Sequence, residues 1–124
     1  MEKTKGLLWL FYILLDASIN WYIIEKKKVN PNHMQLTIIR GIAAILFGAF
    51  ILNIQQSQFI PFVLFTAGSF WILFDLLLNK FRGESLFYIG ENANLDLFGK
   101  KYPILYWSLK VVALIVAIYS YTIL

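Results

Sequence analysis

The sequence predicts an all-α membrane protein with four transmembrane helices. Hydrophobic residues make up 60% of the 124-residue chain, whereas soluble domains contain roughly 45–50%. These residues gather in four runs, at about 7–24, 37–54, 60–79 and 103–123. Each run is long enough to cross a hydrocarbon core of ~30 Å as a helix, which takes roughly 17–25 residues. We therefore expect one four-helix transmembrane domain that covers residues 1–124.

The first run begins after Lys3 and Lys5, in the manner of a secretory signal peptide. It nevertheless continues through Asp16 to Ile24, and no pair of small residues marks a cleavage site. We expect a retained first helix. Its end is marked by the charged residues 25–28, and an Asn-Pro turn at 29–33 follows.

The second run carries Arg40 just inside its start. Gly41, Ala44 and Gly48 form a stripe of small residues, which lets helix backbones approach closely in lipid. The polar turn 55–58 is short. The second and third helices are therefore expected to be antiparallel neighbours.

The third run has Pro61 in its first turn, where proline is tolerated. The loop 80–102 follows, and within it Gly90 and Gly99 bracket a segment with apolar residues that predicts a short interfacial helix or an ordered loop. The fourth run starts at Pro103. One face of this last helix carries Tyr106, Lys110, Ala113, Ala117 and Tyr121.

The two halves of the chain share a pattern of polar residues. Segments 11–20 and 70–79 both read Phe-x-Ile-Leu-x-Asp-x-x-x-Asn, and the segments that begin at Ile39 and Leu109 both place a basic residue second. Matched apolar residues mean little in so hydrophobic a chain, but matched Asp, Asn and basic residues are rarer. We expect two parallel-repeat helical hairpins, related by an axis along the membrane normal.

Charged residues inside these runs predict a polar centre. A charge at membrane depth costs several kcal/mol and is usually paired or functional. At ~1.5 Å of rise per residue, Asp16 matches Lys110 best in depth, and Asp75 matches Arg40. The expected network or solute pathway contains Asp16, Asn20, Arg40, Asp75, Asn79 and Lys110, with Tyr12 and Trp71 as lining residues.

Two interpretations of this centre remain open. The charges could form the pathway of an ion or small-solute channel or transporter, completed in a homo-oligomer because four helices leave little room for a pore. They could instead fix helix packing in a membrane interaction, assembly or holin-like protein. The bilayer, a second copy and an ion or small solute are the expected partners.

Other function classes are disfavoured by composition. The chain has no cysteine, and its one histidine, His33, cannot make a metal site alone. The loop acids Glu84, Glu91 and Asp96 follow no known catalytic or ligand spacing. We therefore favour a non-enzymatic role without a cofactor or metal. The net charge of +4 reflects basic residues that flank the spans, so no nucleic-acid partner is expected.

Aromatic residues gather near the ends of the runs, where such residues usually anchor helices at the membrane interface. These expected anchors are Trp9, Trp21, Tyr22, Tyr102, Trp107, Tyr119 and Tyr121.

The charge distribution predicts the orientation in a plasma or inner membrane. The termini and the 55–59 loop share two basic residues, whereas the opposite loops carry seven: Lys26, Lys27, Lys28, Lys80, Arg82, Lys100 and Lys101. Because basic loops stay cytoplasmic, both termini should lie on the non-cytoplasmic side. A C-terminal tag should be accessible to a reagent added outside intact cells or spheroplasts. A tag accessible only after lysis would contradict this orientation.

Overall fold

A computed structural model describes residues 3–28, 33–89 and 94–124, and the regular elements in these ranges are all helical. They are the 3₁₀ turn η1 (Lys3–Gly6), α1 (Leu7–Glu25), α2 (His33–Leu46), the π-helical turn η2 (Phe47–Ile51), the 3₁₀ turn η3 (Gln56–Gln58), α3 (Phe59–Phe81), α4 (Asn94–Lys101) and α5 (Pro103–Thr122).

Four helical segments are long and apolar enough to cross a membrane: Lys3–Glu25, Met34–Ile51, Gln56–Phe81 and Pro103–Thr122. They coincide with the four predicted runs and indicate a membrane protein. Much of their apolar surface is exposed, for example at Ile42 on α2 and Ile115 on α5. Exposed apolar side chains are expected where helices contact lipid.

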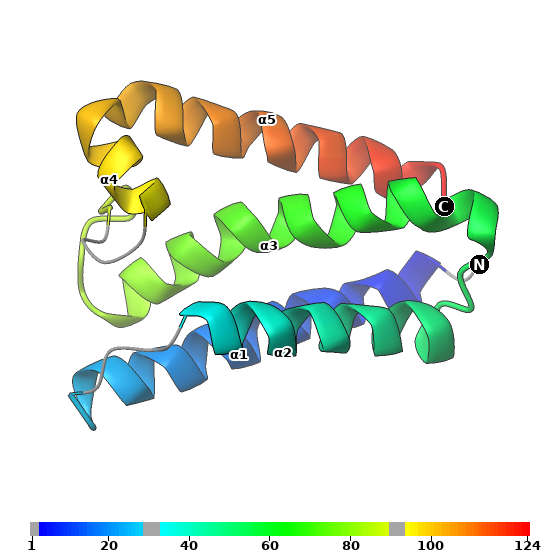
Figure 1. The fold of residues 1–124 in the computed structure, drawn as a ribbon, viewed down its shortest axis with the longest axis horizontal. Helices are drawn as coiled ribbons and strands as arrows, with labels where there is room; N and C mark the ends of the chain where they lie inside the picture. The colour runs from blue at the N-terminus through cyan, green and yellow to red at the C-terminus, as the bar shows by residue number, and fades with distance from the viewer. Residues whose placement is uncertain (1–2, 29–32, 90–93) are drawn as a thin grey trace.

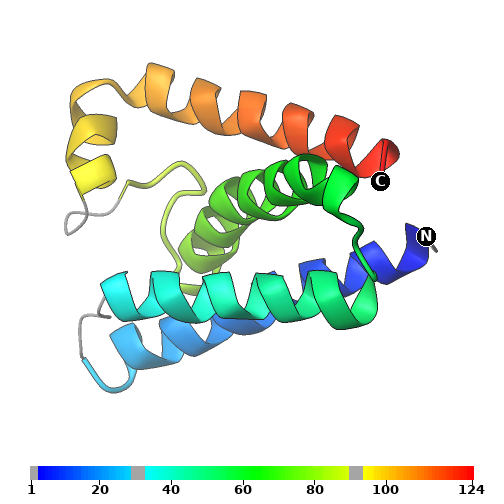
Figure 2. The same ribbon diagram turned by 45° about the vertical axis from the view of Figure 1, so that its right-hand side comes forward.

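The long helices are arranged around α3 rather than around a common axis. α5 lies along one side of α3, and α1 and α2 lie along the other (Figure 1). Both termini and the connection from α2 to α3 lie at one end, whereas α4 and the end of α1 lie at the opposite end (Figures 1 and 2). The termini therefore share an end with the 55–59 connection, as four successive crossings require.

A glycine allows the closest helix contact, between α3 and α5. A Cβ added at Gly68 would lie 2.6 Å from the Ala113 carbonyl oxygen and 3.1 Å from the Ala117 Cβ. Close approach of this kind replaces the hydrophobic force that is absent between helices in lipid. It also confirms the predicted inner face of the last helix, on which Tyr106, Lys110 and Ala117 are buried.

The small-residue stripe predicted for α2 does not play this role, so that prediction was wrong. Gly41 is exposed, and a Cβ added to it would have no other atom within 4 Å, whereas Gly48 faces the Phe62 ring rather than a helix backbone. α2 is held instead by bulky side chains. The Phe47 ring packs 5.6 Å from Trp9 and 6.4 Å from Phe62.

The second helix also differs in its limits. It was expected at 37–54, but α2 begins at His33 and its continuation η2 ends at Ile51. The chain then turns at Asn53, whose φ of 51° is a left-handed conformation that asparagine tolerates. Residues 29–32 of the turn predicted at 29–33 lie outside the described residues, and its last residue, His33, is the first residue of α2.

The segment between α3 and α5 contains a helix, which decides between the two predicted alternatives. α4 packs closely against the first turn of α5. A Cβ added at Gly99 would lie only 2.8 Å from Cγ of Tyr106. The Tyr106 hydroxyl donates to Asp96 Oδ1 at 3.5 Å. Gly90 and Glu91 lie outside the described residues.

The glycine contacts predict opposite effects of the same substitution at two positions. Gly68→Ala should push α3 from α5 and lower the free energy of unfolding by about 1–3 kcal/mol, the usual range for overpacking. Gly41→Ala meets open space, and helix propensity should make it neutral or stabilising by up to about 1 kcal/mol. Unfolding in mixed micelles would measure both changes. Equal effects would contradict the close α3–α5 contact.

Candidate functional site

The first polar centre joins α1 to α2. Arg40 donates from Nε to Asp16 Oδ2 at 2.8 Å and from Nη2 to Asp16 Oδ1 at 3.3 Å. Asn20 donates from Nδ2 to Asp16 Oδ1 at 2.6 Å and to the Asp16 carbonyl oxygen at 2.9 Å. Both carboxylate oxygens are thus engaged, and the Asp16 side chain is only 9% exposed.

Two aromatic rings of α3 cover the Arg40 guanidinium. Its Cζ lies 4.6 Å from the Phe70 ring centroid and 4.4 Å from that of Phe74. The two rings are nearly parallel, with an interplanar angle of 13° and centroids 5.0 Å apart. A cation held over ring faces gains about 0.5–2 kcal/mol. Arg40 therefore fastens α2 to both α1 and α3.

The second polar centre joins α3 to α5. Lys110 Nζ donates to Asp75 Oδ2 in an ion pair. The two partners differ in exposure, because the Lys110 side chain is 0% exposed whereas the Asp75 side chain is 30% exposed. The Asp75 side chain is therefore partly accessible from outside the chain, whereas the Lys110 side chain is not.

Three aromatic rings surround the Lys110 ammonium. Nζ lies 4.3 Å from the Tyr106 centroid, 4.5 Å from that of Trp107 and 5.7 Å from that of Trp71. Both neighbouring pairs of rings meet edge to face, at 89° for Trp71 and Tyr106 and at 85° for Tyr106 and Trp107. Lys110 thus has one carboxylate and a cage of ring faces as its partners.

The two matched asparagines make different contacts. Asn20 bonds to Asp16, as above, whereas Asn79 donates from Nδ2 to the carbonyl oxygens of Leu86 at 2.8 Å and Tyr88 at 2.9 Å. Asn79 therefore holds the segment that follows α3 and does not support the nearby carboxylate. Its inclusion in the polar centre rests on sequence similarity alone.

The ion pairs differ from those expected from depth. Asp16 pairs with Arg40 instead of Lys110, and Asp75 pairs with Lys110 instead of Arg40, so both predicted pairings were wrong. Depth along the membrane normal says nothing about lateral position. α3 lies between α5 and α2 (Figure 2), and each acid lies beside the base of its own half.

Several aromatic residues that build these centres were not recognised in the sequence. Phe70 and Phe74 lie four residues apart on the helix that also carries Asp75, and Tyr106 lies four residues before Lys110. Such spacing places the Tyr106 ring on the face of Lys110, and it places Phe70 and Phe74 on one common face of α3, which differs from the face of Asp75. Trp9 was predicted as an interfacial anchor, but it is buried and donates to the Thr66 carbonyl oxygen at 3.1 Å. Trp107 was also predicted as an interfacial anchor, but its ring lies beside the Lys110 ammonium.

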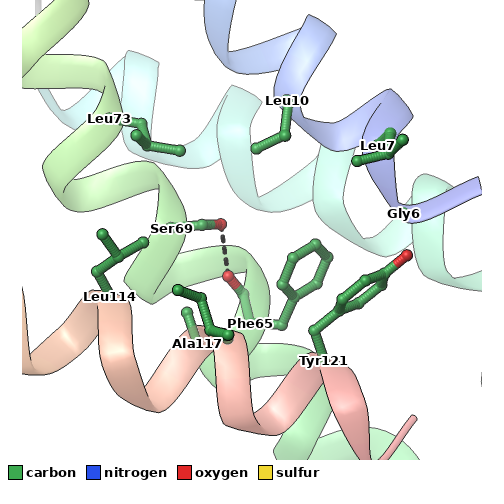
Figure 3. A pocket seen from close by; sticks show the side chains of 10 residues that line it. Gly6, Leu7, Leu10, Phe65, Ser69, Leu73, Leu114, Ala117 and Tyr121 are labelled. Atoms are coloured by element: carbon green, nitrogen blue, oxygen red, sulfur yellow. Dashed lines mark hydrogen bonds between the residues drawn. The ribbon is translucent and has the colours of Figure 1, made fainter. Parts of the chain in front are cut away.

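A separate apolar cavity of about 220 Å³ lies between α1, α3 and α5 near the chain termini. Figure 3 shows the side chains around it. Its lining comprises Gly6, Leu7, Leu10, Phe65, Ser69, Leu73, Leu114, Ala117, Ile118 and Tyr121. The four paired charges are not part of this lining.

Within the described ranges, no group of three His, Cys, Asp or Glu side chains is arranged to hold a metal ion. No protein-family model, curated protein or solved structure matches this chain. The two ion pairs are therefore interpreted from their own geometry.

The first centre predicts strong coupling between Asp16 and Arg40. Arg40→Gln should leave a carboxylate without its counter-charge and cost about 3–5 kcal/mol of unfolding free energy. Adding Asp16→Asn removes that charge and should recover part of the loss. A double-mutant cycle in micelles measures the coupling. Additive losses would contradict a direct pair.

Proposed function

We propose that this chain is a small ion or solute channel or transporter, in which the Asp75–Lys110 pair handles a proton or cation within the membrane. The observation that carries the proposal is the unequal exposure of this pair, with a fully buried Lys110 side chain and an Asp75 side chain that is 30% exposed. Ionisable residues inside membrane spans most often mark ion or proton paths.

The contrast between the two centres supports this choice. Arg40 is always charged, meets Asp16 through two hydrogen bonds and lies against the Phe70 and Phe74 rings. This arrangement is suited to fixing helix positions. Lysine is a more mobile point charge that loses its proton more readily when buried. We therefore assign packing to Asp16 and Arg40, and exchange to Asp75 and Lys110.

The aromatic cage suggests how exchange proceeds. A cation that reaches the exposed side of Asp75 competes with the Lys110 ammonium for the carboxylate. The ammonium then keeps its contacts with Tyr106 and Trp107, which lie 4.3 Å and 4.5 Å from Nζ. These ring faces reduce the cost of separating the pair. A proton would act in the same way by neutralising the carboxylate.

We further propose that the two halves are repeats and that the pathway is completed by a second copy. The repeat is supported by the parallel pairing of Asp16 with Arg40 and of Asp75 with Lys110, each within its own half of the chain. A partner surface is available on α2, where Ile38, Ile42 and Ile45 are exposed around Gly41. We place both termini on the non-cytoplasmic side of a plasma or inner membrane, from the charge asymmetry of the loops.

The alternative is an assembly protein whose buried charges serve packing alone. The Asp16–Arg40 contact favours a packing role for the first centre, because its two hydrogen bonds engage both carboxylate oxygens. The same role for Asp75 does not explain why its side chain stays partly exposed. Flux measurements distinguish the two functions.

Asp75→Asn should abolish flux of protons or monovalent cations through the purified protein in liposomes, because it removes the exchanging carboxylate. Lys110→Met should change the dependence of the flux on cation concentration, because it removes the competing ammonium. Asp16→Asn is the matched control and should reduce stability more than flux per folded protein.

Wild-type flux in a folded Asp75→Asn protein would contradict the proposed site. Absence of flux in the wild type under proton and monovalent cation gradients would support the assembly role instead. Circular dichroism and elution volume in detergent would confirm that each variant is folded before its flux is compared.

A further inference from the structure

The cavity near the termini has the form of a crevice open to the side of the molecule. Leu7 and Leu10 of α1 and Ile118 of α5 form its exposed rim, with exposures of 51%, 39% and 57%. Its floor is α3, from which Phe65 and Ser69 face it (Figure 3). Because these helices are apolar enough to cross a membrane, the opening faces hydrocarbon.

The chemistry of the lining selects a hydrocarbon occupant. Ser69, one of two lining side chains with a hydroxyl, donates it to the Phe65 carbonyl oxygen at 2.5 Å and so offers no free donor. An apolar cavity of ~150 Å³ is already large enough to bind benzene and stays dry. A crevice of about 220 Å³ therefore has room for several methylene groups of a chain.

One polar group at the end of the crevice lacks a partner. The Tyr121 hydroxyl is buried and makes no hydrogen bond within the described part of the chain. It lies over Gly6, where an added Cβ would be 2.6 Å from the hydroxyl oxygen, and its ring stacks on Phe65 with centroids 4.8 Å apart. A buried donor without a partner costs about 1–3 kcal/mol, so an acceptor from a ligand would be stabilising.

Positive charge lies beside this hydroxyl. Lys3 donates to the Thr122 carbonyl oxygen, and its Nζ is 5.9 Å from the Tyr121 ring centroid. An ammonium has three donor protons, so two remain for another acceptor. Lys5 is exposed on the same turn, η1, and Glu2 lies outside the described residues.

We infer that this crevice binds an anionic phospholipid. One acyl chain lies in the apolar cleft between α1, α3 and α5, an ester oxygen accepts the Tyr121 hydroxyl proton, and the phosphate lies near Lys3. The site has three parts in sequence: the apolar lining, the Tyr121 hydroxyl and the Lys3 ammonium. This is the same order as the acyl chain, ester and phosphate of a lipid. This site rests on different residues from the ion pathway.

The test measures binding of phosphatidylglycerol and phosphatidylcholine to the purified protein in detergent by native mass spectrometry. The wild type should bind phosphatidylglycerol more tightly. Tyr121→Phe removes one oxygen and should weaken binding of both lipids about threefold to tenfold, the value of one hydrogen bond. Lys3→Gln should weaken binding of phosphatidylglycerol about fivefold, since a basic residue near anionic lipid contributes about 1 kcal/mol.

Matched controls separate the crevice from the general surface. Tyr119→Phe alters an exposed tyrosine of the same helix, and Lys80→Gln removes an exposed lysine at the opposite end; both should bind lipid like the wild type. Leu10→Trp should fill the crevice and displace the lipid, whereas Leu8→Trp changes a neighbouring exposed leucine that is outside the lining.

Equal binding by Tyr121→Phe and Tyr119→Phe would overturn the proposal, as would equal affinity of the wild type for the two lipids. A lipid-free dimer that dissociates in Leu10→Trp but not in Leu8→Trp would also overturn it, because a second copy would then occupy the crevice. Tyr121→Phe keeps the ring that stacks on Phe65, so its result stands even if Leu10→Trp fails to fold.

Discussion

Charge neutralisation between helices is the constraint on which the arrangement of this protein depends. The four charges of the two ion pairs lie within segments apolar enough to cross a membrane, and each has its oppositely charged partner on another helix. Removing one partner would leave a charge in hydrocarbon, at a cost of several kcal/mol. The pairs therefore link α1 to α2 and α3 to α5, whereas α1 packs against α3 through apolar residues around Trp9.

α3 lies at the centre because its sides offer two kinds of surface. On one side Gly68 admits the backbone of α5, and on the other Phe70 and Phe74 receive the guanidinium of α2. Small residues allow close backbone contact, whereas aromatic rings bridge a wider gap between helices. α2 is consequently held by long side chains, and much of its apolar surface remains exposed.

The two ion pairs share a pattern but differ in their chemistry. Arginine with a carboxylate forms a bidentate, permanently charged contact, and Asn20 and the two phenylalanines complete it. Lysine with a carboxylate forms a single-point contact, here within an aromatic cage and with one partner open. A pattern that looks duplicated in sequence thus supports a fixed packing contact in one half and, in our proposal, an exchange site in the other. Asn79, which holds the following loop, shows the same divergence.

The sequence by itself determined the helical class, the four spans and the residues that are both charged and embedded, because length and hydropathy are local properties of a run. It also identified the inner face of α5, since residues three or four apart share a helix face. Only the tertiary structure decided which acid meets which base, that Gly68 rather than Gly41 allows close packing, and that Phe70, Phe74, Tyr106 and Trp107 surround the cations. These features depend on the lateral order of the helices and on side-chain direction across an interface. Neither the period nor the depth of an apolar run specifies them.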